Sequence, residues 1–164
     1  MLSNIKNKRI YSSIVTEIPG EKSLKIFNDE EKYIAPGTQT IATSSKIVTA
    51  KGEGAIIEDV DGNRFIDFFA GVGVASLGYN HPKYVKYFSE QLAKIHVGSF
   101  TTEVRSKLVK LLAEITPGDL NRSQFYSSGA EAVEAALRLA KSYTKKHEFI
   151  SFWGGFHGKT MGVL

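Results

Sequence analysis

Apolar and polar residues alternate most clearly in the middle of the chain, in the stretch GAIIEDVDGNRFIDFF at residues 54–69. Both halves of this stretch are rich in residues that favour β-strands, and Asp61-Gly62 between them is a dipeptide typical of tight turns. The pattern therefore predicts a β-hairpin. The stretch AGVGVASLG follows and predicts a bend at which other groups approach the backbone closely. Its glycines are Gly71, Gly73 and Gly78.

Two amphipathic helices are predicted after the bend. The first opens at Asn80-His81-Pro82, because proline is favoured in the first turn of a helix. The second begins near Thr102, and Thr116-Pro117-Gly118 ends it. Each helix carries an apolar stripe at helical spacing, and the stripe of the second helix is expected to face a core. The stripes are Val85, Phe88, Leu92 and Ile95 in the first helix, and Val104, Leu108, Leu111, Leu112 and Ile115 in the second.

The last third of the chain is typical of a strand, a helix and a strand, over residues 124–126, 129–143 and 149–153. Such a unit normally forms a right-handed crossover between parallel strands, which predicts an α/β fold. Ligands of open α/β sheets bind beyond the carboxyl ends of the strands. Both loops that leave these ends, SSGAE and GGFHGK, are polar and contain glycine. The first 50 residues show no sustained period, and an arm with one short helix is predicted there.

Composition narrows the class of protein. With 164 residues, 42% hydrophobic and 23% charged, the chain suits a soluble globular domain. The net charge of +4 comes without the dense basic patch of a nucleic-acid surface. Cysteine is absent, which excludes disulfides, thiolate metal sites and cysteine nucleophiles. No apolar stretch approaches the roughly 18 residues of a membrane span, and the start lacks a secretion signal. We expect a cytoplasmic protein without a metal, a nucleic-acid partner or a membrane.

The loop SSGAE predicts a seat for an anion. Ser128 and Glu131 have the spacing of a capping box at the start of a helix. Gly129 and Ala130 then lie in the first turn, where backbone N–H groups lack helical partners and small side chains leave them open. The helix dipole adds positive potential, so a phosphate or carboxylate is favoured there. A well-capped helix with no ligand is the alternative.

The loop GGFHGK resembles part of a nucleotide-binding P-loop, because Gly158, Lys159 and Thr160 match the end of that motif. The first glycine of the motif would fall at Trp153, and Gly154 comes one residue too late. A flat ring is the better ligand: Phe156 is expected to stack on a heteroaromatic face, beside His157. A plain core aromatic and a structural histidine are the alternatives for these two residues. Together the two loops suit a phosphorylated aromatic cofactor such as pyridoxal phosphate.

At this point the sequence resembles the N-terminal part of the class III aminotransferases, which use pyridoxal phosphate. The stretches that carry the resemblance are GEGAIIEDVDGNRFIDFFAGVGVASLGYNHPK, SSGAEAVEAALRLAKSYT and FWGGFHGKTMGVL, in family order from about residue 35 onward. The resemblance implies the start of a PLP-dependent transferase fold of type I. Residues 1–99 would form an N-terminal arm and a small-domain segment with the hairpin. Residues 100–164 would begin the large cofactor-binding domain, with the first βαβ unit of a mainly parallel sheet.

The resemblance also implies roles for individual residues. Gly129 and Ala130 match the pair whose backbone amides hold the cofactor phosphate, and Ser128 borders that pair. Phe156 matches the aromatic residue stacked on the pyridine ring, and His157 the residue beside it. The implied activity is transfer of an amino group from an amino acid or ω-amine donor to a 2-oxo acid, by a homodimer.

Two further positions concern the substrate. Val72 resembles a residue at the substrate entrance. Lys159 stands where the family usually has an arginine that grips a substrate carboxylate; lysine offers a point charge in place of a bidentate fork. Either the carboxylate is held otherwise, or the substrate has none there, as with a diamine. The stretch from Gly78 to Pro82 departs from the common G-H-x-H-P and receives no interpretation.

The family's Schiff-base lysine and the aspartate that pairs with the pyridine nitrogen lie well downstream of the F-H-G motif. Neither position falls within residues 1–164, so no residue of this chain is assigned a catalytic role. We expect the chain by itself to be inactive in transamination. Two alternatives to this family remain: a P-loop-like nucleotide-binding domain, and a degenerate domain that pairs with a partner.

Overall fold

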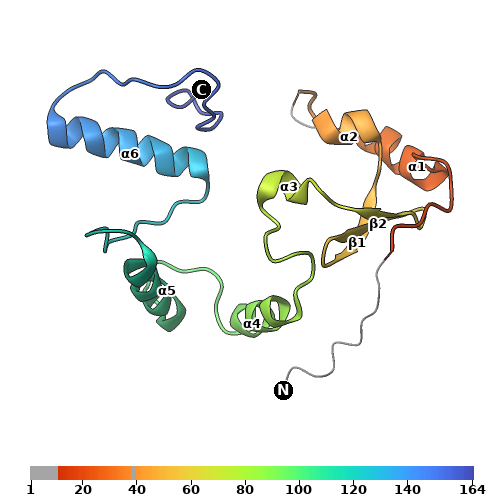
Figure 1. Ribbon diagram of the computed structural model, residues 1–164, viewed down its shortest axis with the longest axis horizontal. Coiled ribbons are helices and arrows are strands. Elements are labelled where there is room, and N and C mark those ends of the chain that lie inside the picture. Colours follow the sequence, from red (N-terminus) through yellow and green to blue (C-terminus); the bar gives the residue numbers. More distant parts are fainter. Residues whose placement is uncertain (1–10, 38–39) are drawn as a thin grey trace. The chain divides into compact units, whose positions relative to one another are not determined.

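The computed structural model describes residues 11–37 and 40–164. The chain divides into two compact units, Met1–Gly98 and Ser99–Leu164, whose elements are shown in Figure 1. Their assignment to the small and large domains of an aminotransferase stays a prediction. Residues 1–10, where the sequence predicts no secretion signal, lie outside the described part of the chain.

The first unit contains a three-stranded antiparallel sheet in the order β1-β2-β3. Strand β1 covers Thr49–Glu53, β2 covers Ile56–Asp59 and β3 covers Arg64–Ile66. The predicted hairpin is confirmed by β2 and β3, which pair in register from Ile56↔Ile66 to Glu58↔Arg64. Gly62 in the turn has φ +92, a conformation that favours glycine. Strand β1 was not predicted, because its sequence TAKGE has no apolar alternation.

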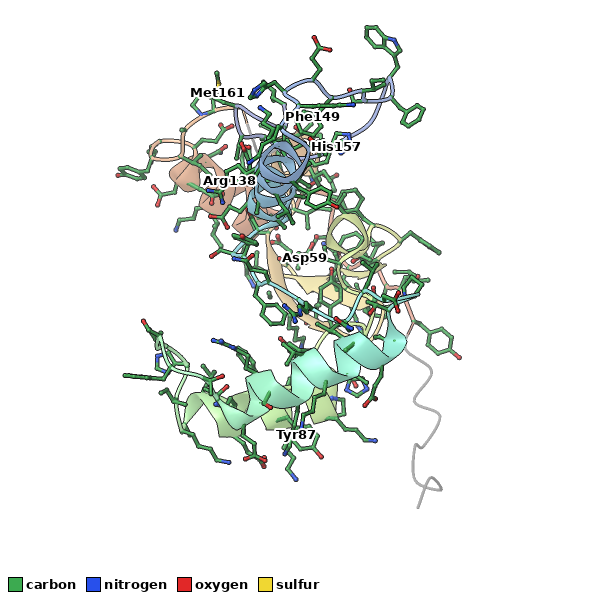
Figure 2. The ribbon with its side chains drawn as sticks, turned by 90° about the vertical axis from the view of Figure 1, so that its left-hand side faces the viewer. Asp59, Tyr87, Arg138, Phe149, His157 and Met161 are labelled. Atoms are coloured by element: carbon green, nitrogen blue, oxygen red, sulfur yellow. The ribbon has the colours of Figure 1, made fainter. Side chains whose placement is uncertain are left out.

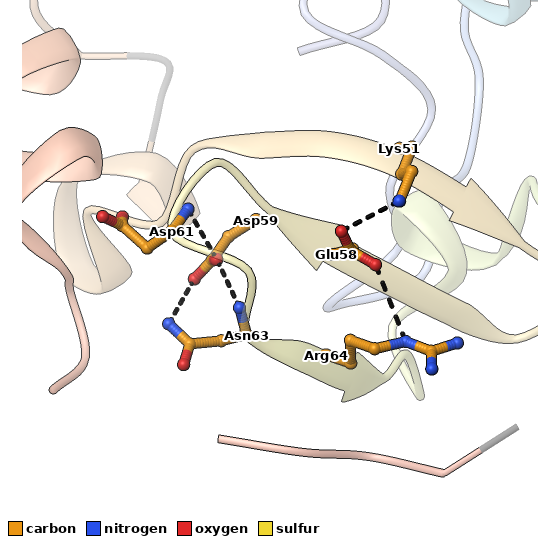
Figure 3. A network of polar contacts seen from close by, with 6 residues as sticks. All are labelled: Lys51, Glu58, Asp59, Asp61, Asn63 and Arg64. Carbon is orange, nitrogen blue, oxygen red and sulfur yellow. Dashed lines mark hydrogen bonds and ion pairs between the residues drawn. The ribbon is translucent and has the colours of Figure 1, made fainter. Parts of the chain in front are cut away.

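Polar side chains hold the hairpin turn together (Figure 3). Asp59 Oδ1 accepts hydrogen bonds from the backbone N–H of Asp61 at 3.0 Å and of Asn63 at 2.8 Å. Asp59 Oδ2 accepts a further bond from Asn63 Nδ2 at 2.8 Å. Both Asp59, 2% exposed, and Asn63, 0% exposed, are buried. On the strands, Glu58 lies between Lys51, at 2.9 Å, and Arg64, at 3.7 Å.

The same turn binds the N-terminal segment. Asn63 Oδ1 accepts hydrogen bonds from the backbone N–H of Val15 at 2.8 Å and of Thr16 at 3.0 Å. The amide nitrogen of Asn63 donates to Thr16 Oγ1 at 2.8 Å. Next to this contact, Ser13 and Arg64 exchange backbone hydrogen bonds of 3.0 and 2.7 Å. The turn that closes the hairpin therefore also fastens the chain that precedes it.

Helix α1, Glu21–Glu30, begins at a glycine that has no side chain to cap it. Asp61 of the hairpin turn supplies the cap from elsewhere in the chain. Its carboxylate accepts hydrogen bonds from the N–H groups of Lys22 and Ser23, both at 2.9 Å, and from Ser23 Oγ at 2.6 Å. These are N–H groups that no helix can satisfy internally.

A second short helix, α2, covers Thr40–Ser45. The prediction of one helix in the first 50 residues was therefore wrong. The sequence of α2, TIATSS, has β-branched and hydroxyl residues and no apolar period, so its pattern does not indicate a helix.

The predicted bend takes the form of α3, Ala70–Gly73, whose four residues all have positive φ. Val72 has φ +65, which is uncommon for a β-branched residue. The predicted close approach to the backbone occurs at Gly78, where a Cβ would lie 2.9 Å from the carbonyl oxygen of Gly54. At Gly73, in contrast, a Cβ would meet nothing within 4 Å.

The two amphipathic helices start where the sequence predicts. Helix α4, Pro82–Leu92, has proline in its first turn, and α5, Glu103–Ile115, is capped by Thr102 Oγ1. Their apolar stripes are largely exposed, so the prediction that the stripe of α5 faces a core is wrong for the described residues. The buried apolar side chains of the described residues are Phe27, Ile56 and Val163.

Helix α6, Gly129–Thr144, begins at Gly129 and is capped by Ser128, as predicted. The strands predicted on either side of it, at 124–126 and 149–153, do not form. A strand requires a neighbouring strand for its hydrogen bonds, and neither segment has one among the described residues. In the second segment, Ile150 is 98% exposed.

Candidate functional site

The first turn of α6 presents open backbone donors. Ser128 Oγ accepts a hydrogen bond from the N–H of Glu131 at 3.2 Å, which is one half of the predicted capping box. The return bond from the Glu131 side chain is missing in the described part of the chain. The N–H groups of Gly129 and Ala130 also have no acceptor among the described residues. A Cβ on Gly129 would meet nothing within 4 Å, so the space beside these donors is open.

The loop that follows α6 returns to this first turn. Figure 1 shows the chain running back along α6, so that its C-terminal loop lies beside the start of the helix. A Cβ on Gly158 would lie 2.6 Å from the Cβ of Ala130 and 2.8 Å from Cγ2 of Val163. Such distances leave no room for a side chain, so the backbone of Gly158 lies directly against Ala130. The two glycine-bearing loops that the sequence singled out are thus in contact.

Phe156 and His157 lie just before this contact. The ring of Phe156 is 76% exposed, and His157 is also exposed. Figure 2 shows His157 and Met161 among the side chains that stand out from this segment. A turn precedes them, in which Gly155 N–H donates to the carbonyl oxygen of Phe152 at 3.1 Å. The aromatic face of Phe156 is therefore available to a flat ligand.

The structure brings most of the predicted site residues together. Ser128, Gly129 and Ala130 are adjacent on α6, and Phe156 and His157 are within two residues of Gly158. Lys159 follows Gly158 directly and is exposed. Val72 belongs to the other unit, in the left-handed turn of α3. The roles assigned to these residues stay predictions.

The P-loop alternative lacks its main structural requirement. In a P-loop the Lys-[ST] pair opens a helix whose N-terminus faces the phosphate. Here residues 159–164 form bends and a turn, and no helix follows Gly158 in the described chain. The hydroxyl of Thr160 instead donates to Glu134 Oε1 at 2.7 Å. The loop therefore has neither the helix nor the free hydroxyl of that motif.

A polar pair in the first unit was missed by the sequence analysis. The hydroxyl of Tyr79 donates to Asp67 Oδ2 at 2.6 Å, while Asp67 Oδ1 accepts from the N–H groups of Phe69 and Ala70 at the start of α3. The Tyr79 bond lowers the pKa of Asp67 below its ordinary 3.8 and raises the pKa of Tyr79 above 10.0. Both residues line a cleft of about 770 Å³ beside β1 and α3. The only sequence signal for this pair was Tyr79, which follows Gly78 at a position where the resemblance predicts histidine.

Other kinds of site are not found in the described residues. No group of three or more histidine, cysteine, aspartate or glutamate side chains is arranged to hold a metal ion there. Across the same residues, none of the helices combines the length and the apolar character that crossing a bilayer requires.

Residues 38–164 match the family described as "Aminotransferase class-III". Acetylornithine aminotransferase of Methanopyrus kandleri is 43% identical over 120 residues, which are 72% of this chain and 31% of that protein. Alanine/serine racemase of Pyrococcus horikoshii is 36% identical over 156 residues, 93% of this chain and 32% of that protein. A solved structure described as "Transaminase with PLP bound" has a TM-score of 0.81 and 24% identity, over 92% of this chain and 35% of that one.

The chain spans about one third of the length of these curated relatives. The structural likeness confirms the predicted fold class, an incomplete α/β fold that corresponds to the start of a PLP-dependent transferase of type I. The family match covers more than half of the chain and includes both glycine-bearing loops. From the family match and the sequence identity of its relatives, the chain belongs to the class-III aminotransferase family.

Proposed function

We propose that this chain forms the cofactor-binding region of an aminotransferase that moves an amino group from an amino acid or ω-amine donor to a 2-oxo acid. Pyridoxal phosphate, the cofactor of the family, would be held between the two loops. The observation that carries the proposal is the contact of Gly158 with Ala130, because it joins the anion seat of α6 to the loop that bears Phe156.

The residues present fit the phosphate end of the cofactor. Gly129 and Ala130 offer two backbone donors at the positive end of a 16-residue helix. Ser128 caps the N–H of Glu131 and so leaves the two earlier donors to a ligand. A Cβ on Gly129 would meet nothing within 4 Å, which supports the approach of an anion on that side of the first turn.

The residues present also fit the ring. Phe156 would cover one face of the pyridine, and His157 would lie beside it. When bound, pyridoxal phosphate supplies an electron sink for the carbanion that forms at the donor carbon. The contribution of these side chains is to orient the ring and to shield it from water. Proton transfer is assigned to residues that this chain does not supply, because none of its lysines matches the family's catalytic position.

Substrate contacts are proposed for Lys159 and Val72. Lys159 is exposed and follows the loop contact directly, so its ammonium group is free to meet an anionic substrate group. Because lysine is a point charge, it would orient a carboxylate less strictly than the arginine usual in the family. Val72 would line the substrate entrance. A homodimer and a cytoplasmic location complete the proposal.

The cofactor seat is tested in the 164-residue chain with pyridoxine 5′-phosphate, which has no aldehyde and cannot form imines with surface lysines. The chain has one tryptophan, Trp153, three residues before Phe156, so its fluorescence reports on the loop. We expect saturable quenching. Gly129→Asp places a carboxylate at the anion seat and should weaken binding at least about tenfold.

The matched control is Asn121→Asp, which adds the same negative charge at an exposed position of the same unit without a change of backbone conformation. It should bind the ligand like the unaltered chain. No saturable quenching in the unaltered chain, or equal losses in the two variants, would show that the loops are not a cofactor seat.

Activity is tested in a chimera, in which the matching segment of the Methanopyrus enzyme is replaced by the corresponding residues of this chain. We expect amino transfer from acetylornithine to a 2-oxo acid, lost on Gly129→Asp. The Pyrococcus relative favours a second candidate activity, because it is described as a racemase. Interconversion of L- and D-alanine by the chimera, without consumption of a 2-oxo acid, would support that activity over transamination.

A further inference from the structure

Glu134 connects α6 to the loop that carries the predicted ring contact. Its Oε1 accepts a hydrogen bond from Thr160 Oγ1 at 2.7 Å and another from the N–H of Gly162 at 3.1 Å. Both partners lie more than 25 residues away along the chain, so these bonds fix tertiary structure. Neither the family resemblance nor the pattern of the sequence assigns this glutamate a role.

The loop fits α6 closely at two successive turns of one helix face. Ala130 and Glu134 are four residues apart, so they lie one above the other on α6. Gly158 lies against Ala130, and a Cβ on Gly162 would be 2.6 Å from Glu134 Oε2. Val163, 8% exposed, is the buried apolar residue of this contact. Glycine at 158 and 162 therefore allows the backbone of the loop to lie along this face.

We infer that Glu134 is a positioning residue that seats residues 158–163 on α6 and thereby sets the place of Phe156 relative to the anion seat. Phe156 is two residues from Gly158, a span of at most about 7 Å of chain. With Gly158 fixed against Ala130, the ring platform stays within reach of a ligand bound at Gly129 and Ala130. This inference rests on the proposed function, because it concerns a ligand that touches both loops.

A positioning role differs from mere support of α6 in its effect on two ligands. Inorganic phosphate would use only the open N–H groups at the start of α6, whereas pyridoxine 5′-phosphate would touch both loops. Loss of the Glu134 bonds should therefore weaken the second ligand and leave the first unchanged. Damage to the helix itself would weaken both.

The experiment compares Glu134→Ala and Glu134→Gln with the unaltered 164-residue chain. Glu134→Gln keeps an acceptor oxygen for Thr160 and Gly162. Glu114→Ala serves as the control, because it removes an exposed glutamate from α5 in the same unit. Binding of both ligands is followed by the amide NMR shifts of Gly129 and Ala130, and the seating of the loop by hydrogen exchange of the Gly162 amide.

In Glu134→Ala we expect exchange of the Gly162 amide to rise at least about tenfold, and affinity for pyridoxine 5′-phosphate to fall about tenfold, as for loss of a hydrogen bond to a charged group. Affinity for phosphate should stay within about twofold, and Glu134→Gln should restore most of both losses. Glu114→Ala should change neither.

Three results would overturn the inference: unchanged exchange of Gly162, equal weakening of the two ligands, or unchanged affinity for pyridoxine 5′-phosphate despite faster exchange. Failure of the proposed function has a different signature, in which the unaltered chain binds pyridoxine 5′-phosphate no better than phosphate. In that case the positioning role toward a ligand fails with it, and the exchange of Gly162 alone decides whether Glu134 seats the loop.

Discussion

Replacing Asn63 by alanine should remove a large part of the stability of the first unit. Asn63 is fully buried, and its side chain makes four hydrogen bonds, two accepted from Val15 and Thr16 and two donated to Thr16 and Asp59. Alanine keeps none of them. The substitution thus tests whether the hairpin turn, and not apolar packing, fastens the N-terminal segment.

The expected loss can be worked from the exposure of the partners. Val15 and Thr16 are exposed, so water replaces their bonds at a net cost of about 1 kcal/mol each. Asp59 is 2% exposed, and its Oδ2 would lose its donor without access to water, which costs about 1–3 kcal/mol. The three bonds to Val15 and Thr16 and the one to Asp59 sum to about 4–6 kcal/mol, a large fraction of the roughly 5–15 kcal/mol that stabilises a typical domain.

The assay is urea unfolding followed by far-UV circular dichroism, together with hydrogen exchange of the Ser13 and Arg64 amides, which bond each other's carbonyl oxygens. Asn28→Ala is the control, because Asn28 is exposed on α1 and should change stability by less than about 0.5 kcal/mol. If Asn63→Ala unfolds at the same urea concentration as Asn28→Ala, with unchanged exchange at Ser13, the reasoning is refuted.

Three further predictions concern single side chains of the first unit. The hydroxyl of Ser23, and after it the N–H groups of Lys22 and Ser23, hold the pKa of Asp61 below its ordinary 3.8. The Asp61 carboxylate therefore stabilises the fold above pH 3.8, and this stabilisation is lost as the pH falls through the lowered pKa of Asp61. In Asp61→Asn, the free energy of unfolding should fall less steeply with pH in this acid range. An unchanged pH dependence would contradict the stabilising role of the Asp61 carboxylate. Tyr79→Phe should raise the pKa of Asp67 toward 3.8, measured by carbon-13 NMR of the carboxyl group, since the tyrosine bond is the main cause of the lowering; an unmoved pKa would disprove that cause. Gly78→Ala should cost about 2–4 kcal/mol, from positive φ and a methyl group placed against Gly54. Gly73→Ala meets nothing within 4 Å and should cost only about 1–2 kcal/mol, so equal losses would exclude the Gly54 contact.

Local signals in the sequence were sufficient for the elements that depend on local chemistry. Asp61-Gly62 located the hairpin, Pro82 the start of α4, and Ser128 the start of α6, because turns and caps are determined by a few neighbouring residues. The prediction of strands at 124–126 and 149–153 was wrong, because strands do not depend on local chemistry alone. A parallel strand depends on neighbours distant in the chain, and the described residues provide none.

The candidate site was predictable in part. The sequence singled out the two glycine-bearing loops and predicted that one ligand touches both, and the contact between Gly158 and Ala130 brings these loops together. Glu134 gave no signal, because a glutamate inside an amphipathic helix is typical of a solvated face. Its bonds to Thr160 and Gly162 depend on the path of a loop that local pattern does not determine.

The way in which the N-terminal segment is attached has a consequence for its behaviour in the cold. Asn63 holds it through hydrogen bonds to Val15 and Thr16, while the apolar side chains of Ile14 and Val15 remain exposed. Apolar burial loses strength as water is cooled, because exposing apolar surface raises the heat capacity of unfolding, whereas exposing polar surface lowers that heat capacity. This segment should therefore remain attached near the freezing point of water, where contacts that depend on buried apolar surface become weaker.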